Sequence, residues 1–146
     1  MRDQLLVDGY NVLHAWPELR ELLGESLELA RDRLVDRLAT LGQVTGTDVT
    51  VVFDAHRTLA RRDSEEMRDG VRVVFTRRGR SADQAIERRA YQARERRQPI
   101  LVATSDSFHR AMLKGMGAGV IDAAELLRQV EAAEAQLSRR LRELSG

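Results

Sequence analysis

The sequence predicts an α/β fold: a mostly parallel central sheet of about four to five strands with helices on both faces. Two observations lead to this prediction. Short runs of β-branched and other apolar residues, typical of buried strands, recur along the chain. Between most of them lie longer segments whose apolar residues repeat at three- and four-residue steps, as in amphipathic helices. Strands that alternate with helices favour parallel pairing, because each helix carries the chain back across the sheet.

The chain has 146 residues, enough for one domain with a buried core, and no linker or internal repeat divides it. We therefore expect a single domain over residues 1–146. No apolar run approaches the roughly 18 residues that a membrane span needs, and the N-terminus lacks the pattern of a signal peptide. With no cysteine, disulfides and thiolate chemistry are excluded. These features predict a cytoplasmic protein with no membrane partner.

The apolar runs place the strands of the predicted sheet. They are expected at residues 5–8, 49–54, 71–76 and 100–104, with a short one at 120–121. The arginine-rich segment from residue 55 to 70 has little apolar periodicity, so it is predicted to be a mobile loop.

Capping residues and apolar periodicity place the helices. After the first strand we expect a loop, held by Trp16 and Pro17, that leads into a helix capped by Ser26. The segment "SADQ" matches a Ser-x-x-Gln capping box, so a second helix should run from residue 81 to about 97. A short helix should follow Ser105. The amphipathic C-terminal helix, residues 122–146, is expected to pack on the domain.

Acidic residues fall where three of the predicted strands end. Asp8 ends the first strand and Asp54 the second, while Asp106 follows the fourth. Ligands of open parallel sheets bind at the carboxyl ends of the strands, so these side chains should share one rim. Asp83 lies in the first turn of the helix after the third strand. Glu87 lies one turn further along the same face.

Carboxylates brought together repel one another unless a cation or a proton intervenes. Oxygen ligands without cysteine select a hard cation such as Mg²⁺ or Mn²⁺, and such an ion suits phosphodiester hydrolysis. Purely structural interpretations also exist. Asp8 could cap a turn, Asp54 could simply end a strand, and acids such as Asp83 and Asp106 stabilise the first turn of a helix.

Asn11 and the histidines carry weaker signals. The Asn11 amide could orient a carboxylate, a water or a phosphate, or it could be a turn residue. His14, His56 and His109 show no metal-ligand spacing and are interpreted as incidental.

Positive charge gathers in one part of a chain whose net charge is only +1. Residues 55–80 contain eight arginines and four acids. The guanidinium group suits phosphate. Arginine replaces lysine almost everywhere in the chain, however, and base composition of the gene would also produce that bias.

Four segments together resemble the YacP-like branch of the NYN domains, relatives of the PIN-type nucleases: "LLVDGYNVLHAWPEL", "VTVVFDAH", "VRVVFTRRGRSADQAIE" and "ILVATSD". The likeness extends over roughly residues 4–130, in the expected order. It implies a PIN-like three-layer α/β/α fold and metal-dependent ribonuclease activity. The branch includes a ribosome-associated endonuclease that cleaves messenger RNA.

Carried over by position, the resemblance implies metal-binding or catalytic roles for Asp8, Asp83 and Asp106. It implies supporting roles for three further residues: Asn11, Asp54 and Glu87. The surface that faces RNA or the ribosome would lie in the basic segment and would use Arg57, Arg61, Arg62, Arg77, Arg78 and Arg80.

We therefore expect an endoribonuclease, dependent on Mg²⁺ or Mn²⁺, that cleaves single-stranded RNA, in particular messenger RNA on or near the ribosome. One alternative is a non-catalytic RNA- or ribosome-binding module with a vestigial acidic site. Another is a phosphatase or phosphotransfer domain with an aspartyl nucleophile. Its chemistry usually needs a second acid two residues after the nucleophile, which both "DGYN" and "DAH" lack.

Overall fold

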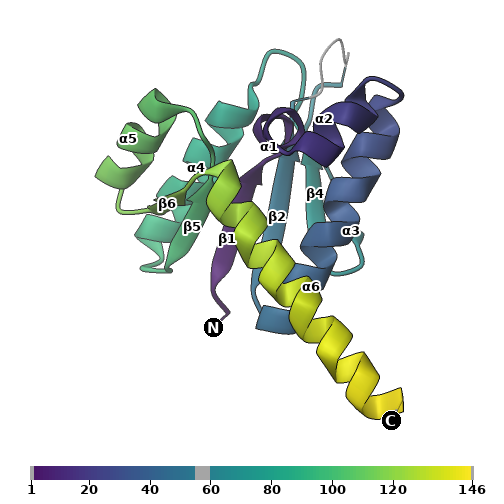
Figure 1. Ribbon diagram of the computed structural model, residues 1–146. Coiled ribbons are helices and arrows are strands. Elements are labelled where there is room, and N and C mark those ends of the chain that lie inside the picture. The colour runs from purple at the N-terminus through teal and green to yellow at the C-terminus, as the bar shows by residue number, and fades with distance from the viewer. Residues whose placement is uncertain (1, 55–59, 146) are drawn as a thin grey trace.

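The computed structural model describes residues 2–54 and 60–145 and shows a three-layer α/β/α arrangement (Figure 1). The central sheet has six strands in the order β3-β4-β2-β1-β5-β6. All neighbouring strands are parallel except β3 and β4. The predicted fold class is therefore confirmed, with one strand more than expected.

The strands begin and end within one or two residues of the predicted positions, apart from the additional one. Their bounds are β1 Gln4–Asp8, β2 Asp48–Phe53, β3 Ser64–Arg68, β4 Val71–Phe75, β5 Ile100–Ala103 and β6 Gly119–Ile121.

The structure contains six helices over the described residues: α1 Gly9–Ala15, α2 Pro17–Leu23, α3 Leu27–Thr45, α4 Ala82–Glu95, α5 Ser107–Gly115 and α6 Ala123–Ser145. Both predicted serine caps are present. The Ser26 hydroxyl accepts a hydrogen bond from the Leu29 amide at 3.2 Å. Ser81 and Gln84 form the complete capping box.

The expected loop after the first strand is wrong, because α1 begins directly after Asp8 and α2 follows it. Pro17 is the first residue of α2, a position that suits proline because its missing amide hydrogen is not needed there. Trp16 lies between the two helices, is 1% exposed, and donates from Nε1 to the Ala123 carbonyl at 2.8 Å. These contacts tie α1 and α2 to the start of α6.

The predicted loop over residues 55–70 is also wrong in part, because Ser64–Arg68 forms β3, an edge strand antiparallel to β4. Asp69 and Gly70 join the two strands and have φ values of 50° and 86°, the left-handed backbone of a tight hairpin turn. The strand was hidden because its residues are polar and mostly exposed, as is common at a sheet edge. Residues 55–59 lie outside the described part of the chain.

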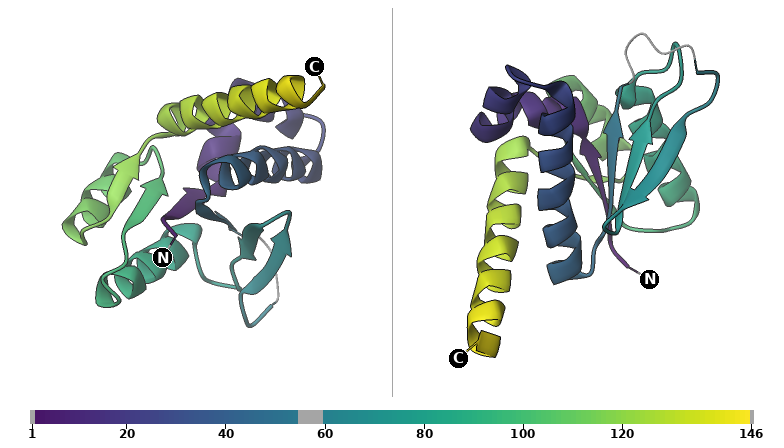
Figure 2. Two further views of the ribbon diagram at one scale, coloured as in Figure 1. Left: turned by 90° about the horizontal axis from the view of Figure 1, so that it is seen from below. Right: turned by 90° about the vertical axis from the view of Figure 1, so that its right-hand side faces the viewer.

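The helices α3 and α6 lie side by side over one face of the sheet (Figure 2). The buried residues of α3 and α6, such as Leu34 and Leu126, pack in one large apolar cluster with the sheet. The expected packing of the C-terminal helix is therefore confirmed for its first half. Beyond it, Leu141 and Leu144 are 55% and 85% exposed.

Arg37 joins three helices on the same face. Its guanidinium lies 2.7 Å from the Glu134 carboxylate on α6 and 3.3 Å from Glu18 on α2. It also lies over the Trp16 ring, 5.2 Å from the ring centroid. Arg37 is only 9% exposed, and the hydrogen bond to Glu134 raises its pKa above the ordinary arginine value. Because burial reduces screening by water and salt, the charges of this pair attract each other more strongly than those of an exposed surface pair.

The second face of the sheet is covered by α4 and α5. The residues that α4 buries are four alanines and Ile86. Among the described residues, we find no helix with the length and hydropathy to span a bilayer.

Candidate metal centre

Asp8 lies at the topological switch point of the sheet. It is the last residue of β1. The strands β2, β4 and β3 extend the sheet on one side of β1, while β5 and β6 extend it on the other. At such a point the connections leave in opposite directions and open a crevice at the carboxyl ends of the strands. The structure therefore places Asp8 where α/β proteins bind ligands.

Gly9 allows α1 to begin immediately behind Asp8. A Cβ atom at this position would lie 2.4 Å from Cδ1 of the Phe53 ring and 2.9 Å from the Val52 carbonyl oxygen. Any side chain would therefore push α1 away from the end of β2. The glycine that follows Asp8 in the sequence is thus required by packing, and that packing fixes the position of the acid.

Three potential ligand side chains meet at this edge: Asp8 from β1, Asp83 from the first turn of α4, and His109 from α5. One ligand atom of each lies within 4.8 Å of those of the other two. The three residues are far apart in the sequence. The predicted meeting of Asp8 and Asp83 is therefore present in the structure.

Asp8 is 9% exposed, and its environment favours the protonated carboxyl group. Burial is the main cause and the negative charge of Asp83 the second; together they raise its pKa from 3.8 to about 6. Two hydrogen bonds lower the pKa of Asp8. One comes from the backbone amide of Asn11 and the other from the Thr104 hydroxyl, which lies 3.4 Å from Asp8 Oδ2. The site therefore favours a neutralising partner, which a bound cation would supply.

His109 lies beneath the two acids of α4. It is 2% exposed, with Nδ1 3.4 Å from Asp83 Oδ1 and Nε2 3.5 Å from Glu87 Oε1. Our interpretation of His109 as incidental is therefore wrong. In the sequence, His109 was marked only by its position three residues after Asp106, at the start of a helix. In the folded protein, its imidazole at this position faces α4.

Asp106 is the N-cap residue of α5, so it lies just before the first helical turn in which we had considered it as a stabilising acid. It is exposed, and its Oδ1 accepts a hydrogen bond from the His109 amide at 3.0 Å. Its own amide donates to the Thr104 hydroxyl at 3.4 Å, and that hydroxyl contacts Asp8. Among the described residues, the three-residue ligand group does not include Asp106. Its role as a metal ligand stays a prediction.

Asn11 connects α1 to the loop that carries Asp106. Its side-chain oxygen accepts a hydrogen bond from the Ser105 amide at 3.0 Å. The Ser105 hydroxyl in turn accepts one from the Ala123 amide at 3.1 Å. Asn11 thus supports Asp8 through its backbone and the Ser105–Asp106 loop through its side chain. Thr104, which is fully buried, is a further supporting residue that our sequence reasoning missed.

The remaining two predicted acids differ in their contacts. Glu87 lies one turn after Asp83 on α4, with its side chain 30% exposed and facing His109. Asp54 directly follows β2 and is half-buried. It makes no hydrogen bond or ion pair with another residue that the structure describes, so its carboxylate is available to a ligand.

Positive charge borders the acidic site along the start of α4. An open hollow of about 660 Å³ is lined by Arg61, Arg77, Arg78, Gly79, Arg80, Gln84 and Arg88. It contains four of the six arginines predicted to contact RNA. Arg62 is exposed but does not line it. Arg57 lies outside the described residues. Arg88, from α4, adds a cation that the sequence analysis did not select.

Comparison with known proteins agrees with this architecture. A family model described as the YacP-like NYN domain matches residues 5–145. The protein YacP of Bacillus subtilis (strain 168) is 41% identical over 144 residues, which are 99% of this chain and 84% of that protein. The crystal structure of Rae1 (YacP) from Bacillus subtilis superposes with a TM-score of 0.84, covering 98% of this chain and 82% of that one. The W164L mutant of the same protein gives 0.83, with 98% and 84% covered.

Proposed function

We propose, from the premise that this chain belongs to the YacP-like NYN domain family and has its nuclease-type fold, that it is an endoribonuclease. Its reaction would be the hydrolysis of phosphodiester bonds in single-stranded RNA, with Mg²⁺ or Mn²⁺ as cofactor. The substrate would be messenger RNA on or near the ribosome. The observation that carries the proposal is the meeting of Asp8, Asp83 and His109 at the switch point of the sheet.

The donor atoms at the site fit a hard divalent cation. Carboxylate oxygens of Asp8 and Asp83 are the ligands that Mg²⁺ and Mn²⁺ prefer. His109 is better suited to orient the acids, because its two ring nitrogens face Asp83 and Glu87. A neutral imidazole donates a hydrogen bond from one nitrogen at a time.

When bound, the cation would polarise the phosphate and lower the pKa of water. The side chains of the protein would orient the reactants and hold the site together. Asp54 and Asp106, whose carboxylates are accessible, would orient the attacking water and the scissile phosphate. Asn11 and Thr104 would hold Asp8 and the Asp106 loop in place. Expulsion of the 3′-oxygen would leave 5′-phosphate and 3′-hydroxyl ends.

The basic hollow beside α4 would bind the RNA backbone. Its arginines and the acidic site share the carboxyl edge of the sheet and the start of α4. Guanidinium groups contact phosphate oxygens without reading base identity. RNA affinity should therefore fall steeply as salt concentration rises.

The test is cleavage of single-stranded RNA by the wild type and by Asp8→Asn, with Mn²⁺, with Mg²⁺ and with chelator. We expect metal-dependent cleavage by the wild type and a loss of roughly a hundredfold or more in the variant, since even outer-shell changes cost about 10- to 100-fold at metal sites. Asp36→Asn, an exposed position on α3, is the control and should cut like the wild type.

Two results would contradict the proposal. Equal cutting by the wild type and Asp8→Asn would remove the metal centre from the reaction. Salt-sensitive RNA binding without any metal-dependent product would indicate the non-catalytic binding module instead. Calorimetric titration with Mn²⁺ distinguishes these results, because an intact centre binds the ion and a vestigial one does not.

A further inference from the structure

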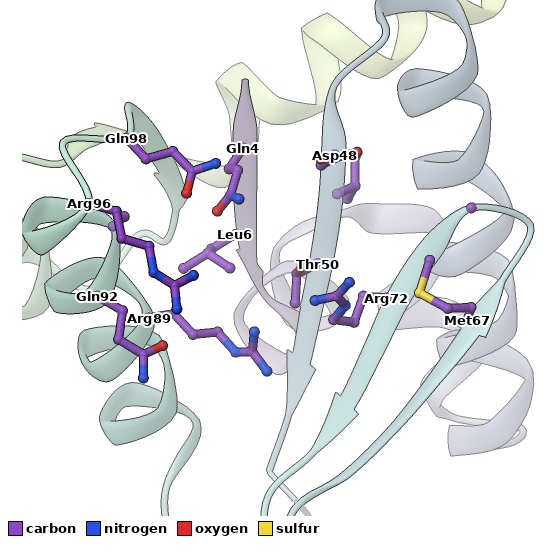
Figure 3. Close-up of a pocket in the computed structure, with 13 residues that line it drawn as sticks. Gln4, Leu6, Asp48, Thr50, Met67, Arg72, Arg89, Gln92, Arg96 and Gln98 are labelled. Carbon is purple, nitrogen blue, oxygen red and sulfur yellow. The ribbon is translucent and has the colours of Figure 1, made fainter. Parts of the chain in front are cut away.

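A second polar pocket lies on the α4 face of the sheet, toward the amino ends of β1 and β2 (Figure 3). It has a volume of about 190 Å³. The residues that characterise it are Arg72, Arg89, Arg96, Gln4, Gln92 and Gln98, and we call it the α4 pocket. The acidic centre lies at the carboxyl ends of the same strands, so the two sites are at opposite ends of α4.

The arginines of the α4 pocket come from two elements and extend into the space between them (Figure 3). Arg72 lies on β4, Arg89 lies on α4, and Arg96 is the C-cap residue that directly follows α4. On α4, Arg89, Gln92 and Arg96 are spaced by three and four residues, which places all three on one side of the helix. This basic side of α4 lies next to its buried alanines and, through Arg89, contacts Glu65 of the β3–β4 hairpin.

These cations are only partly neutralised. Glu65 on β3 is paired with both Arg89 and Arg72, the latter at 3.9 Å. One acid therefore serves two arginines. The Arg96 guanidinium makes no hydrogen bond or ion pair with any residue that the structure describes. Asp48 is the single acid in the pocket lining, and it is paired with Arg2 at 3.4 Å.

The chemistry of the lining selects an oxyanion. Guanidinium groups offer only hydrogen-bond donors, and the glutamine amides add further donors. Their forked geometry matches phosphate oxygens. A cation would be repelled, and an apolar ligand would leave these groups without partners.

The position of the pocket relates it to the acidic centre. Both sites use the same helix, with Asp83 in its first turn, Arg89 near its middle and Arg96 at its C-cap. At about 1.5 Å per residue, Arg89 lies roughly 9 Å and Arg96 roughly 20 Å along the axis from Asp83. A strand lying along α4 from the acidic centre would therefore reach the pocket several nucleotides away.

We propose that the α4 pocket binds a backbone phosphate of the RNA strand, remote from the bond that is cleaved. The identity of the ligand as RNA rests on the proposed function. The pocket holds the strand at a second point, so that RNA long enough to reach it binds more tightly than RNA that covers only the acidic centre. Because the contact is to phosphate, it is independent of sequence.

The experiment measures the affinity of oligouridylates of increasing length in the presence of chelator, which prevents cleavage. The variant is Arg96→Gln, which removes a guanidinium without leaving an acid unpaired. We expect it to weaken binding of long RNA about three- to tenfold and to leave short RNA unaffected. The slope of log K against log salt should fall by about 0.7, the value for one phosphate contact on a single strand.

The matched control is Arg142→Gln, on the exposed end of α6. It makes the same change of charge far from the pocket and should bind RNA of every length like the wild type. A variant with Arg72→Gln and Arg89→Gln combined should weaken long RNA further. Its melting temperature is measured alongside, so that loss of folding is recognised.

The outcomes separate the pocket from the nuclease activity. Equal affinity of the wild type and Arg96→Gln for long RNA would show that the α4 pocket does not bind the strand, even if the wild type cleaves RNA. Length-dependent binding that requires Arg96 would support it, even where no metal-dependent cleavage occurs. Inorganic pyrophosphate serves as the second probe. Arg96-dependent binding of pyrophosphate with Arg96-independent binding of RNA would mean a free phosphate ligand and would also overturn the RNA contact.

Discussion

The two faces of the sheet are built differently. On one face, α3 and α6 contribute large side chains such as Leu34, Leu38 and Leu126, which are fully buried. On the other, α4 buries alanines at four of its five core positions. The first face has a thick apolar layer with few charges inside it. The second has a thin layer, and the candidate metal centre and the α4 pocket both lie along its helix.

The difference shows how a helix can bring charged groups to a sheet. Small side chains allow a close approach of helix and sheet. Asp83 can then reach Asp8 at the end of β1, and Arg89 can reach Glu65 on β3. A helix that buried leucines would lie further away. We infer that the face covered by α3 and α6 supplies most of the stability. The face covered by α4 buries less apolar surface, and its helix positions the charged side chains of the two candidate sites.

The largest expected effect on stability lies on the face covered by α3 and α6. Leu34→Ala removes a fully buried side chain and should lower the free energy of unfolding by about 3 to 5 kcal/mol, because it loses apolar contacts and leaves a cavity. Urea denaturation measures this loss. The affinity of the folded protein for Mn²⁺ should be unchanged. A loss of less than about 1 kcal/mol would contradict our division of roles between the two faces.

The second largest effect is expected at Asp8, where substitution should raise the stability of the metal-free protein. The folded protein binds the Asp8 proton more tightly than the unfolded chain, with a pKa of about 6 against 3.8. The contribution of Asp8 to stability should therefore fall as the pH rises from about 4 to about 6, by roughly 3 kcal/mol at about 1.4 kcal/mol per pKa unit. Asp8→Asn removes this titration. In the absence of metal it should be more stable than the wild type by up to that amount above about pH 6, and similar below about pH 4.

Denaturation at the two pH values, with and without Mn²⁺, checks this prediction. Added metal should stabilise the wild type by binding only the folded form, and it should not stabilise Asp8→Asn. Metal affinity of the wild type should rise with pH through about 6, because the ion must displace the proton. A variant that is destabilised at every pH would mean that Asp8 mainly supports the turn into α1.

A smaller effect on stability is expected on the face covered by α4. Ala90→Leu places a larger side chain where α4 packs on the sheet; Ala90 is 2% exposed. Overpacking of this kind costs about 1 to 3 kcal/mol. It should also weaken Mn²⁺ binding, because Asp83 moves with the helix. Calorimetric titration of the folded variant measures the second effect. Unchanged metal affinity would show that α4 does not need its close position.

The smallest effect is expected at the exposed end of α6. Leu144 is 85% exposed, so Leu144→Ser should change the free energy of unfolding by less than about 0.5 kcal/mol. Thermal melting measures this change. A larger loss would indicate that another surface covers this end of the helix in solution.

The sequence predicted the positions of five of the six strands, the serine caps of α3 and α4, and the acids at the strand ends. These features are local: periodicity reports which side of a strand or helix is buried, and a cap depends on residues three apart. The edge strand β3 was missed because its polar residues carry no apolar pattern. The helix α1 was missed because its start depends on the packing of Gly9 against Phe53.

The sequence by itself determined that acids would stand at the carboxyl ends of parallel strands, because strand direction follows from the alternation of strands and helices. Only the tertiary structure decided which side chains meet there. It placed His109 between Asp83 and Glu87 and made Asp106 a helix cap. It also gathered Arg72, Arg89 and Arg96 around one pocket. Such pairings depend on how far each helix lies from the sheet and how it is rotated, and packing of residues distant in the chain sets both.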